Sequence, residues 1–327
     1  MLNFFRTNQA IGNFALLIIL VVFQLPTVIN GFPEVQGSPA GIFDAFFTNL
    51  AVTKPTLVWV PSTLLVWIQA FIINQMLQQT RTSKEVNLFG GLFLITFSVS
   101  SPHGFLALDY HIANTILLLL INTLFRLGRG GSAAGSIFNL GLWAGLAGLF
   151  QTTYLIVFFL ALIGLNTIRT GKNRERIMAL FGLITPFLLE YTYLFWLDQT
   201  DLFWSQFKIT LIPLLDFKNY PFLPDQIALI LGGLYLVPVL LASNQIRIKR
   251  NINSQKRITL LFNGMLLAGL TLFLKPQIGI EHILILSIFI SILFAEWIAD
   301  IRNRWASLYF FVILIFIFAI QFYPIIV

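Results

Sequence analysis

Residues 137–168 read IFNLGLWAGLAGLFQTTYLIVFFLALIGLNTI, an apolar block without a charged residue. A bilayer core of roughly 30 Å needs about 20 helical residues, so this block is long for one crossing and short for two of the usual length. Gln151, Thr152 and Thr153 interrupt it near the middle. They predict a tight turn between two short helices, over 137–150 and 154–168.

The chain on both sides of this block has the same apolar character. It is 57% hydrophobic and 10% charged, against about 25% charged residues in soluble domains. We therefore expect a single integral membrane domain over 1–327, an all-α polytopic bundle of about eleven transmembrane helices, some short or kinked. The expected spans are 11–29, 56–76, 88–100, 110–125, 137–150, 154–168, 177–196, 226–241, 258–274, 283–295 and 305–327.

The basic residues predict how the bundle is oriented. When eleven spans alternate, all but four of the 20 Lys and Arg residues fall on one side. By the positive-inside rule that side is cytoplasmic, which predicts a multi-pass inner-membrane protein with a cytoplasmic N-terminus and a periplasmic C-terminus. A single span over 137–168 would move every later loop to the other side and remove the asymmetry. The four exceptions are Lys54, Lys208, Lys218 and Lys275.

Composition also excludes several classes of function. The net charge of +7 is explained by the basic loops and does not require a nucleic-acid partner, because no nucleic-acid-binding motif is present. Cysteine is absent, so the chain has no disulfide framework and no thiolate metal site. No metal site is predicted and the cofactor stays unknown. The basic loop 244–257 predicts contact with anionic membrane lipids.

Residues 101–115, SPHGFLALDYHIANT, form a polar cluster between two apolar runs. In the predicted orientation they lie at the outer ends of helices, and so does the third histidine. An ionisable residue inside a span costs about 2.5–3.5 kcal/mol and usually faces the bundle interior or a water-filled cavity. The sequence thus predicts an outward-facing polar cavity. The candidate substrate-binding residues are His103, Asp109, His111, Asn114, Glu190 and His282.

A simpler interpretation stays open for these residues. The histidines can be ordinary interface residues, and Glu190 can pair with Tyr191 or Tyr193. Asp109 and His111 need not share a helix face.

The first outer segment, 30–55, contains the candidate catalytic acids Glu34 and Asp44. Its part 41–50 mixes apolar and polar residues and can lie flat on the membrane as an interfacial helix. The alternative is that both acids are only solvated.

Residues 77–94, His111–Asn114, 138–154 and 180–189 together resemble an uncharacterised family of polytopic inner-membrane proteins from Bacteroidota. The resemblance covers nearly the whole chain and implies a location in the inner membrane. It implies no activity.

Residues 141–165 and 180–189 are also similar to the polytopic glycosyltransferases that use polyprenyl-phosphate-linked sugars. That resemblance implies an enzyme of cell-envelope biogenesis with an acidic catalytic residue in its first outer loop. Glu34 or Asp44 would be the base, and His103, Asp109 and His111 would line the phosphate or acceptor site.

Two other classes of function stay open. One is a non-catalytic subunit or scaffold of an envelope complex, in which the small residues of 141–149 would pack against other membrane subunits. The other is a transporter or flippase with Glu190 as its coupling residue.

Overall fold

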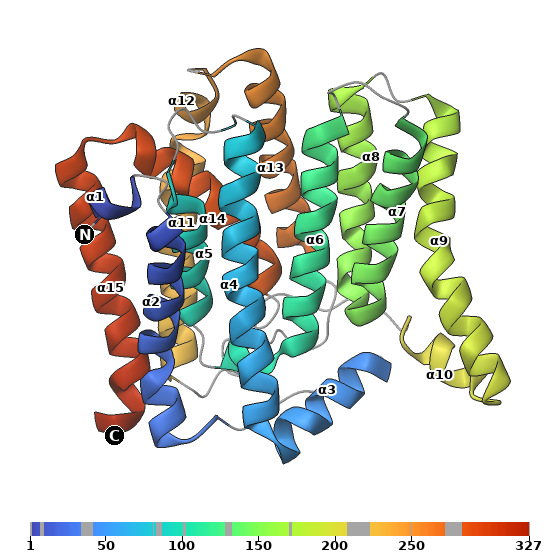
Figure 1. Ribbon diagram of the computed structural model, residues 1–327, viewed down its shortest axis with the longest axis horizontal. Helices are drawn as coiled ribbons and strands as arrows, with labels where there is room; N and C mark the ends of the chain where they lie inside the picture. The colour runs from blue at the N-terminus through green and yellow to red at the C-terminus, as the bar shows by residue number, and fades with distance from the viewer. Residues whose placement is uncertain are drawn as a thin grey trace.

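A computed structural model describes residues 2–6, 10–33, 42–80, 82, 87–100, 103–127, 133–169, 172–207, 223–248, 250–271 and 283–326. These residues form helices joined by turns and contain no strand. The predicted all-α bundle is therefore confirmed (Figure 1).

The helices follow one another with short connections. The first half comprises α1 (Leu2–Phe5), α2 (Ala10–Asn30), α3 (Ile42–Thr53), α4 (Pro55–Thr80), α5 (Phe89–Val99), the 3-10 helix η1 (His103–Leu106), α6 (Leu108–Arg126) and α7 (Ala133–Phe150). The second half comprises the 3-10 helix η3 (Thr152–Ile156), α8 (Val157–Ile168), α9 (Asn173–Trp196), α10 (Thr200–Ser205), α11 (Leu223–Leu241), α12 (Ser243–Ile248), α13 (Ile252–Leu270), α14 (Ile283–Asp300) and α15 (Asn303–Ile326).

Among the described residues, six helices are long and apolar enough to cross a membrane, and they fit a multi-pass integral membrane protein. They are α2, α4, α6, α7, α9 and α15. The other predicted spans coincide in sequence with α5, α8, α11, α13 and α14. The total of about eleven crossings stays a prediction.

The apolar block 137–168 divides as its sequence indicates. Helix α7 ends at Phe150, Gln151 has an extended backbone (φ −139°, ψ 111°), and η3 leads directly into α8. The predicted turn between two short helices is therefore confirmed. Figure 1 shows α7 and α8 running side by side in opposite directions.

Helices α7 and α9 approach so closely that their backbones touch. A Cβ atom built on Gly141 would lie 1.7 Å from the backbone oxygen of Ala179, and one on Gly182 would lie 2.2 Å from that of Phe138. Small residues permit such contacts between membrane helices. The small-residue face expected to receive another subunit is thus already covered by α9 of the same chain.

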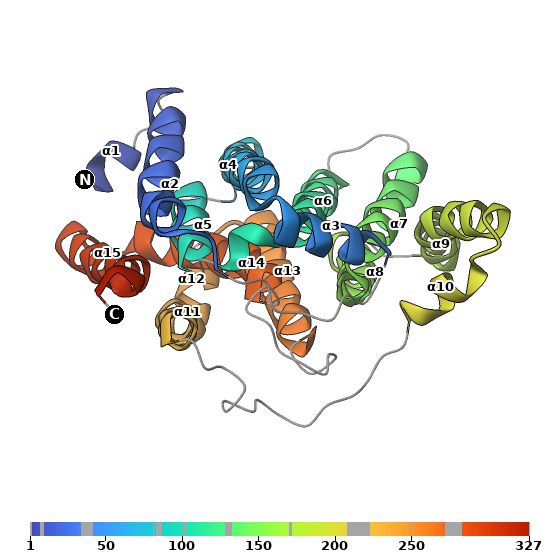
Figure 2. The same ribbon diagram turned by 90° about the horizontal axis from the view of Figure 1, so that it is seen from below.

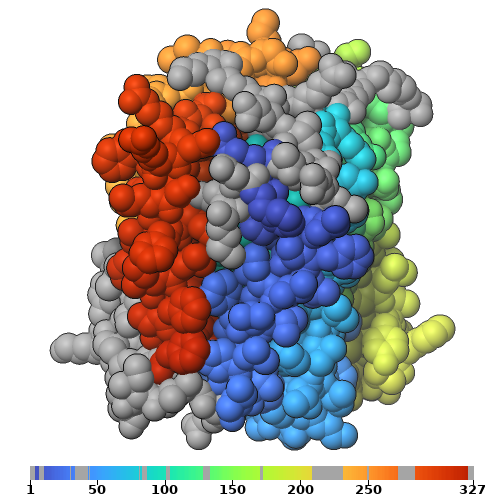
Figure 3. Space-filling view, turned by 60° about the vertical axis from the view of Figure 1, so that its left-hand side comes forward, coloured from blue at the N-terminus to red at the C-terminus, as the bar shows by residue number. Residues whose placement is uncertain are grey.

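The outer surfaces of the bundle are apolar. Figure 3 shows α15 and α2 side by side on one face, where Ile18 and Phe311 are each 63% exposed. Exposed apolar side chains on this scale are expected where lipid is the solvent. An apolar groove between the two helices is lined by Val22, Phe23, Leu25, Pro26, Ile29, Phe318 and Phe322.

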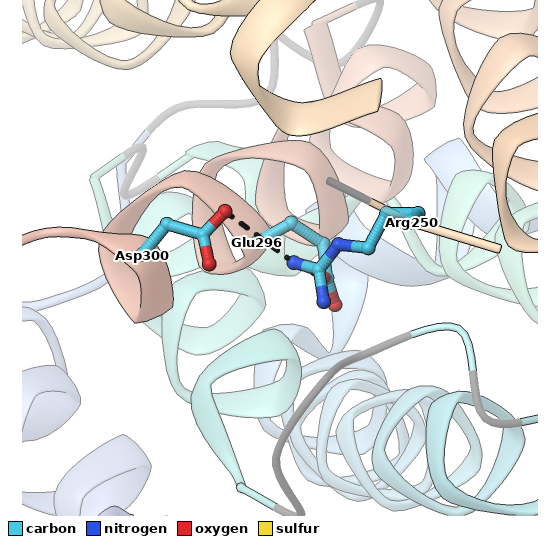
Figure 4. Close-up of polar contacts among 3 residues, drawn as sticks. All are labelled: Arg250, Glu296 and Asp300. Carbon is cyan, nitrogen blue, oxygen red and sulfur yellow. Dashed lines mark hydrogen bonds and ion pairs between the residues drawn. The ribbon is translucent and has the colours of Figure 1, made fainter. Parts of the chain in front are cut away.

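The end of the bundle that carries α12 is held together by two arginines. Arg250 is buried and donates to Glu296 at 2.7 Å, with Asp300 3.7 Å away (Figure 4). Arg257 donates to the backbone oxygens of Thr80 and Phe125, which lie at the C-terminal ends of α4 and α6. A cation is favourable there because the last helical carbonyls lack intrahelical partners.

These contacts correct one detail of the sequence interpretation. The basic loop 244–257 was expected to face lipid headgroups, but Arg250 and Arg257 turn into the protein. Lys256 of the same loop is exposed.

The opposite end of the bundle carries α3, η1 and α10 (Figures 1 and 2). Helix α3 crosses this end, and its residue Ala51 belongs to a small apolar cluster, separate from the main core, with Val58, Leu106 and Leu108. Phe43 and Phe47 of α3 place their rings 5.1 Å and 6.5 Å from the ring of Phe150. The predicted helix in the first outer segment is thus present, and it lies over the end of α7.

Candidate functional site

Beneath α3, hydrogen-bonded side chains from α4, α6, η3, α9 and α10 form what we call the polar layer. Its members are Gln69, Asp109, His111, Asn114, Gln151, Thr152, Tyr154, Glu190 and Gln206. All except Thr152 are buried.

Asp109 contacts the break between α7 and η3. Its carboxylate oxygen Oδ2 accepts a hydrogen bond from Nε2 of Gln151. The extended backbone at Gln151 ends α7 directly after Phe150, and both partners of this bond are buried. Asp109 also lies in the first turn of α6, where the helix dipole favours a negative charge. The amide and the helix end together offset the cost of burying a carboxylate.

Asn114 joins three elements. The Tyr154 hydroxyl donates to Asn114 Oδ1 at 2.6 Å, and Asn114 Nδ2 donates to the backbone oxygen of Leu284 at 2.9 Å. These two bonds connect α6 to η3 and to the first turn of α14. Because Asn114 and Tyr154 are almost fully buried, each depends on the other to satisfy its polar group.

His111 turns toward η1. Its Nε2 lies 3.0 Å from the backbone oxygen of Gly104, and its ring stacks on Phe105. Its backbone oxygen accepts from Gln69 Nε2 at 2.7 Å. The other ring nitrogen, Nδ1, is buried and has no hydrogen-bond partner among the described residues.

Glu190 lies in α9 and is held from α10. Gln206 Nε2 donates to Glu190 Oε2 at 3.0 Å, and Thr152 Oγ1 donates to the backbone oxygen of Gln206 at 3.3 Å. Neither adjacent tyrosine bonds to this carboxylate; Tyr191 packs against Phe203. The expected pairing of Glu190 with a tyrosine is therefore wrong among the described contacts, because α10 brings a glutamine to it.

The candidate residues are brought together unevenly. Asp109 and Asn114 both bond to the turn at Gln151 and Tyr154, and Glu190 reaches the same turn through Gln206. His111 lies in the same turn of α6 but faces η1. Asp109 and His111 share no partner in the described contacts, as their spacing on a helix suggested.

The other candidates are only partly described. Glu34 and His282 lie outside the described residues. Asp44 lies in α3 and His103 in η1, while their side chains are outside the described part. The proposed catalytic role of either acid stays a prediction. Within the described residues, no group of three His, Asp or Glu side chains is placed to hold a metal ion.

Four members of the polar layer escaped the sequence interpretation: Gln69, Gln151, Tyr154 and Gln206. The signal for Gln151 was present, because it opens the polar break in an apolar block, but the break was interpreted only as a turn. Gln69 is a single amide within the long apolar helix α4. Its role becomes visible only once α4 and α6 are packed together.

The polar layer combines carboxylates, amides, hydroxyls and one imidazole. No described Lys or Arg bonds to any of its members; Lys54, at the junction of α3 and α4, is exposed. Such a set can accept and donate hydrogen bonds to a polar group that enters beneath α3. Comparison of the chain with protein-family models, with curated proteins and with solved structures gave no match.

Proposed function

We propose that this integral membrane protein is a glycosyltransferase-like enzyme of inner-membrane envelope biogenesis that acts on a polyprenyl-phosphate-linked sugar. The observation that carries the proposal is the buried polar layer beneath α3. Asp109, Asn114 and Gln151 provide carboxylate and amide groups at one end of a bundle whose outer surfaces are apolar. A lipid-linked sugar needs both environments, one for its chain and one for its headgroup.

In this proposal the base comes from the first outer segment. Asp44 lies in α3, directly after Phe43, which packs on Phe150, and Gln151 is the next residue of the chain. Glu34 is the second candidate. One of these acids would remove a proton from the acceptor while the polar layer orients the sugar. General base catalysis of this kind contributes about 10²–10⁴-fold to a rate.

The test uses the purified full chain in nanodiscs with a panel of polyprenyl-phosphate-linked hexoses. Release of polyprenyl phosphate is followed by mass spectrometry. We expect Asp44→Asn or Glu34→Gln to lower this release by about 10²-fold or more. The matched control is Asp201→Asn, because Asp201 is an exposed acid in α10 at the same end of the bundle.

Two results would contradict the proposal. One is that no donor in the panel releases polyprenyl phosphate. The other is that both acid variants retain the full rate of the unaltered chain.

Glu190 supports a transporter or flippase as the second candidate function. It lies inside α9, and its Oε1 is buried without a hydrogen-bond partner among the described residues. A carboxylate in this situation can take up and release a proton during transport. Loss of proton-dependent translocation in Glu190→Gln, in a protein that releases no polyprenyl phosphate, would favour this function. The scaffold hypothesis loses its specific support, because α9 covers the small residues of α7.

A further inference from the structure

The contact between His111 and η1 determines which ring nitrogen carries the proton. The backbone oxygen of Gly104 can only accept a hydrogen bond, and it lies 3.0 Å from His111 Nε2. Nε2 is therefore the donor, and in the neutral imidazole Nδ1 is left with a lone pair. That Nδ1 is an acceptor without a donor among the described residues, in a side chain that is 1% exposed.

Glu190 presents a second unused acceptor in the polar layer. Its Oε2 accepts from Gln206, whereas Oε1 is buried and has no partner among the described residues. Buried polar atoms in proteins are nearly always hydrogen-bonded, to protein or to something that the protein binds. Both unused atoms therefore call for a group that donates hydrogen bonds.

The charges around these acceptors favour a neutral donor. Asp109 and Glu190 are both carboxylates, and no described Lys or Arg bonds to any member of the layer. A phosphate would bring further negative charge and offers acceptor oxygens where donors are needed. Sugar hydroxyls donate as well as accept, and the surrounding amides of Asn114, Gln151 and Gln206 match both roles.

We infer that the polar layer binds the hydroxyl groups of an uncharged sugar, with His111 Nδ1 and Glu190 Oε1 as hydrogen-bond acceptors, and that the phosphate of a lipid-linked donor binds elsewhere. This inference deepens the proposed function, and rests on it for the choice of a sugar as the source of the hydroxyls. It also replaces the earlier expectation that Asp109 and His111 line a phosphate site.

The experiment measures binding without turnover. The full chain in nanodiscs of zwitterionic lipid is titrated with methyl glycosides of glucose, galactose and mannose, with inorganic phosphate, and with methylammonium. The thermal unfolding midpoint is followed, because a ligand that binds the folded state raises it. We expect a saturable rise with at least one glycoside and none with phosphate or methylammonium.

The informative variant is His111→Gln. A glutamine can still donate from Nε2 to the Gly104 oxygen but has no acceptor at the position of Nδ1, so we expect about tenfold weaker glycoside binding, roughly 1.4 kcal/mol. Glu190→Gln should weaken it similarly. Thr167→Ala is the control, because Thr167 bonds only within α8 to the oxygen of Ile163.

The outcomes separate this inference from the proposed function. A shift with phosphate or methylammonium alone, or glycoside binding unchanged in both His111→Gln and Glu190→Gln, overturns the inference. So does the absence of a shift with every glycoside, even if polyprenyl phosphate is released from lipid-linked donors. Glycoside binding without any such release upholds the inference and contradicts the proposed function.

Discussion

At the scale of single residues, the polar layer depends on pairs in which each member satisfies the other. Tyr154 and Asn114 are the clearest example, because the hydroxyl donates to Oδ1 at 2.6 Å and both side chains are at most 1% exposed. Sequence analysis identified Asn114 but not its partner, which is 40 residues further along the chain. Nothing in the local pattern of either residue specifies this pairing.

We expect Tyr154→Phe to lower the free energy of unfolding by about 1–2 kcal/mol, because Asn114 Oδ1 loses its donor in a buried site. Equilibrium unfolding of the purified protein in mixed micelles measures the change. Tyr193→Phe is the matched control, since Tyr193 is 63% exposed and should change stability by less than about 0.5 kcal/mol. Equal stability of Tyr154→Phe and the unaltered chain would show that the hydroxyl contributes nothing.

At the scale of helices, the seam between α7 and α9 depends on the absence of side chains. Gly141, Gly145 and Gly182 each face backbone atoms of the opposite helix at distances that exclude a Cβ. This close approach fixes the position of α9, which carries Glu190 to the polar layer. The sequence showed a run of small residues and indicated close packing, but not which helix would fill the face.

We expect Gly141→Ala to destabilise the protein by about 1–3 kcal/mol, because its methyl group would lie 1.7 Å from the Ala179 oxygen and would push the helices apart. Gly135→Ala tests the same change in the same helix where nothing lies within 4 Å. It should be neutral or slightly stabilising, since alanine favours helix. Equal loss of stability in the two variants, measured by unfolding in mixed micelles, would refute the packing argument.

At the scale of the whole molecule, the two ends of the bundle differ in chemistry. Arg250 and Arg257 hold together the end that carries α12, whereas α3 and the polar layer occupy the other. Positive-inside asymmetry predicts that the α12 end faces the cytoplasm. Sidedness matters for the proposed function, because it decides in which compartment a lipid-linked sugar would meet Asp44.

The chain has no cysteine, so single cysteines report sidedness directly. We expect a membrane-impermeant maleimide to label Asp201→Cys in cells whose inner membrane is intact, and Lys256→Cys only after that membrane is opened. Both positions are exposed, one in α10 and one in α13. The reverse pattern would invert the predicted topology and remove the periplasmic setting of the proposed site.

The sequence by itself determined that the chain is an all-helical membrane bundle and that 137–168 breaks at Gln151. It could do so because lipid offers backbone groups no partner, so long apolar runs must be helical, and a polar interruption in such a run must leave the helix. Only the tertiary structure decided that Gln151 meets Asp109, that Gln206 meets Glu190, and that α9 covers the glycines of α7. Those contacts depend on how each helix is rotated and how deep it lies, and a helix that is apolar on every side carries little trace of either in its sequence.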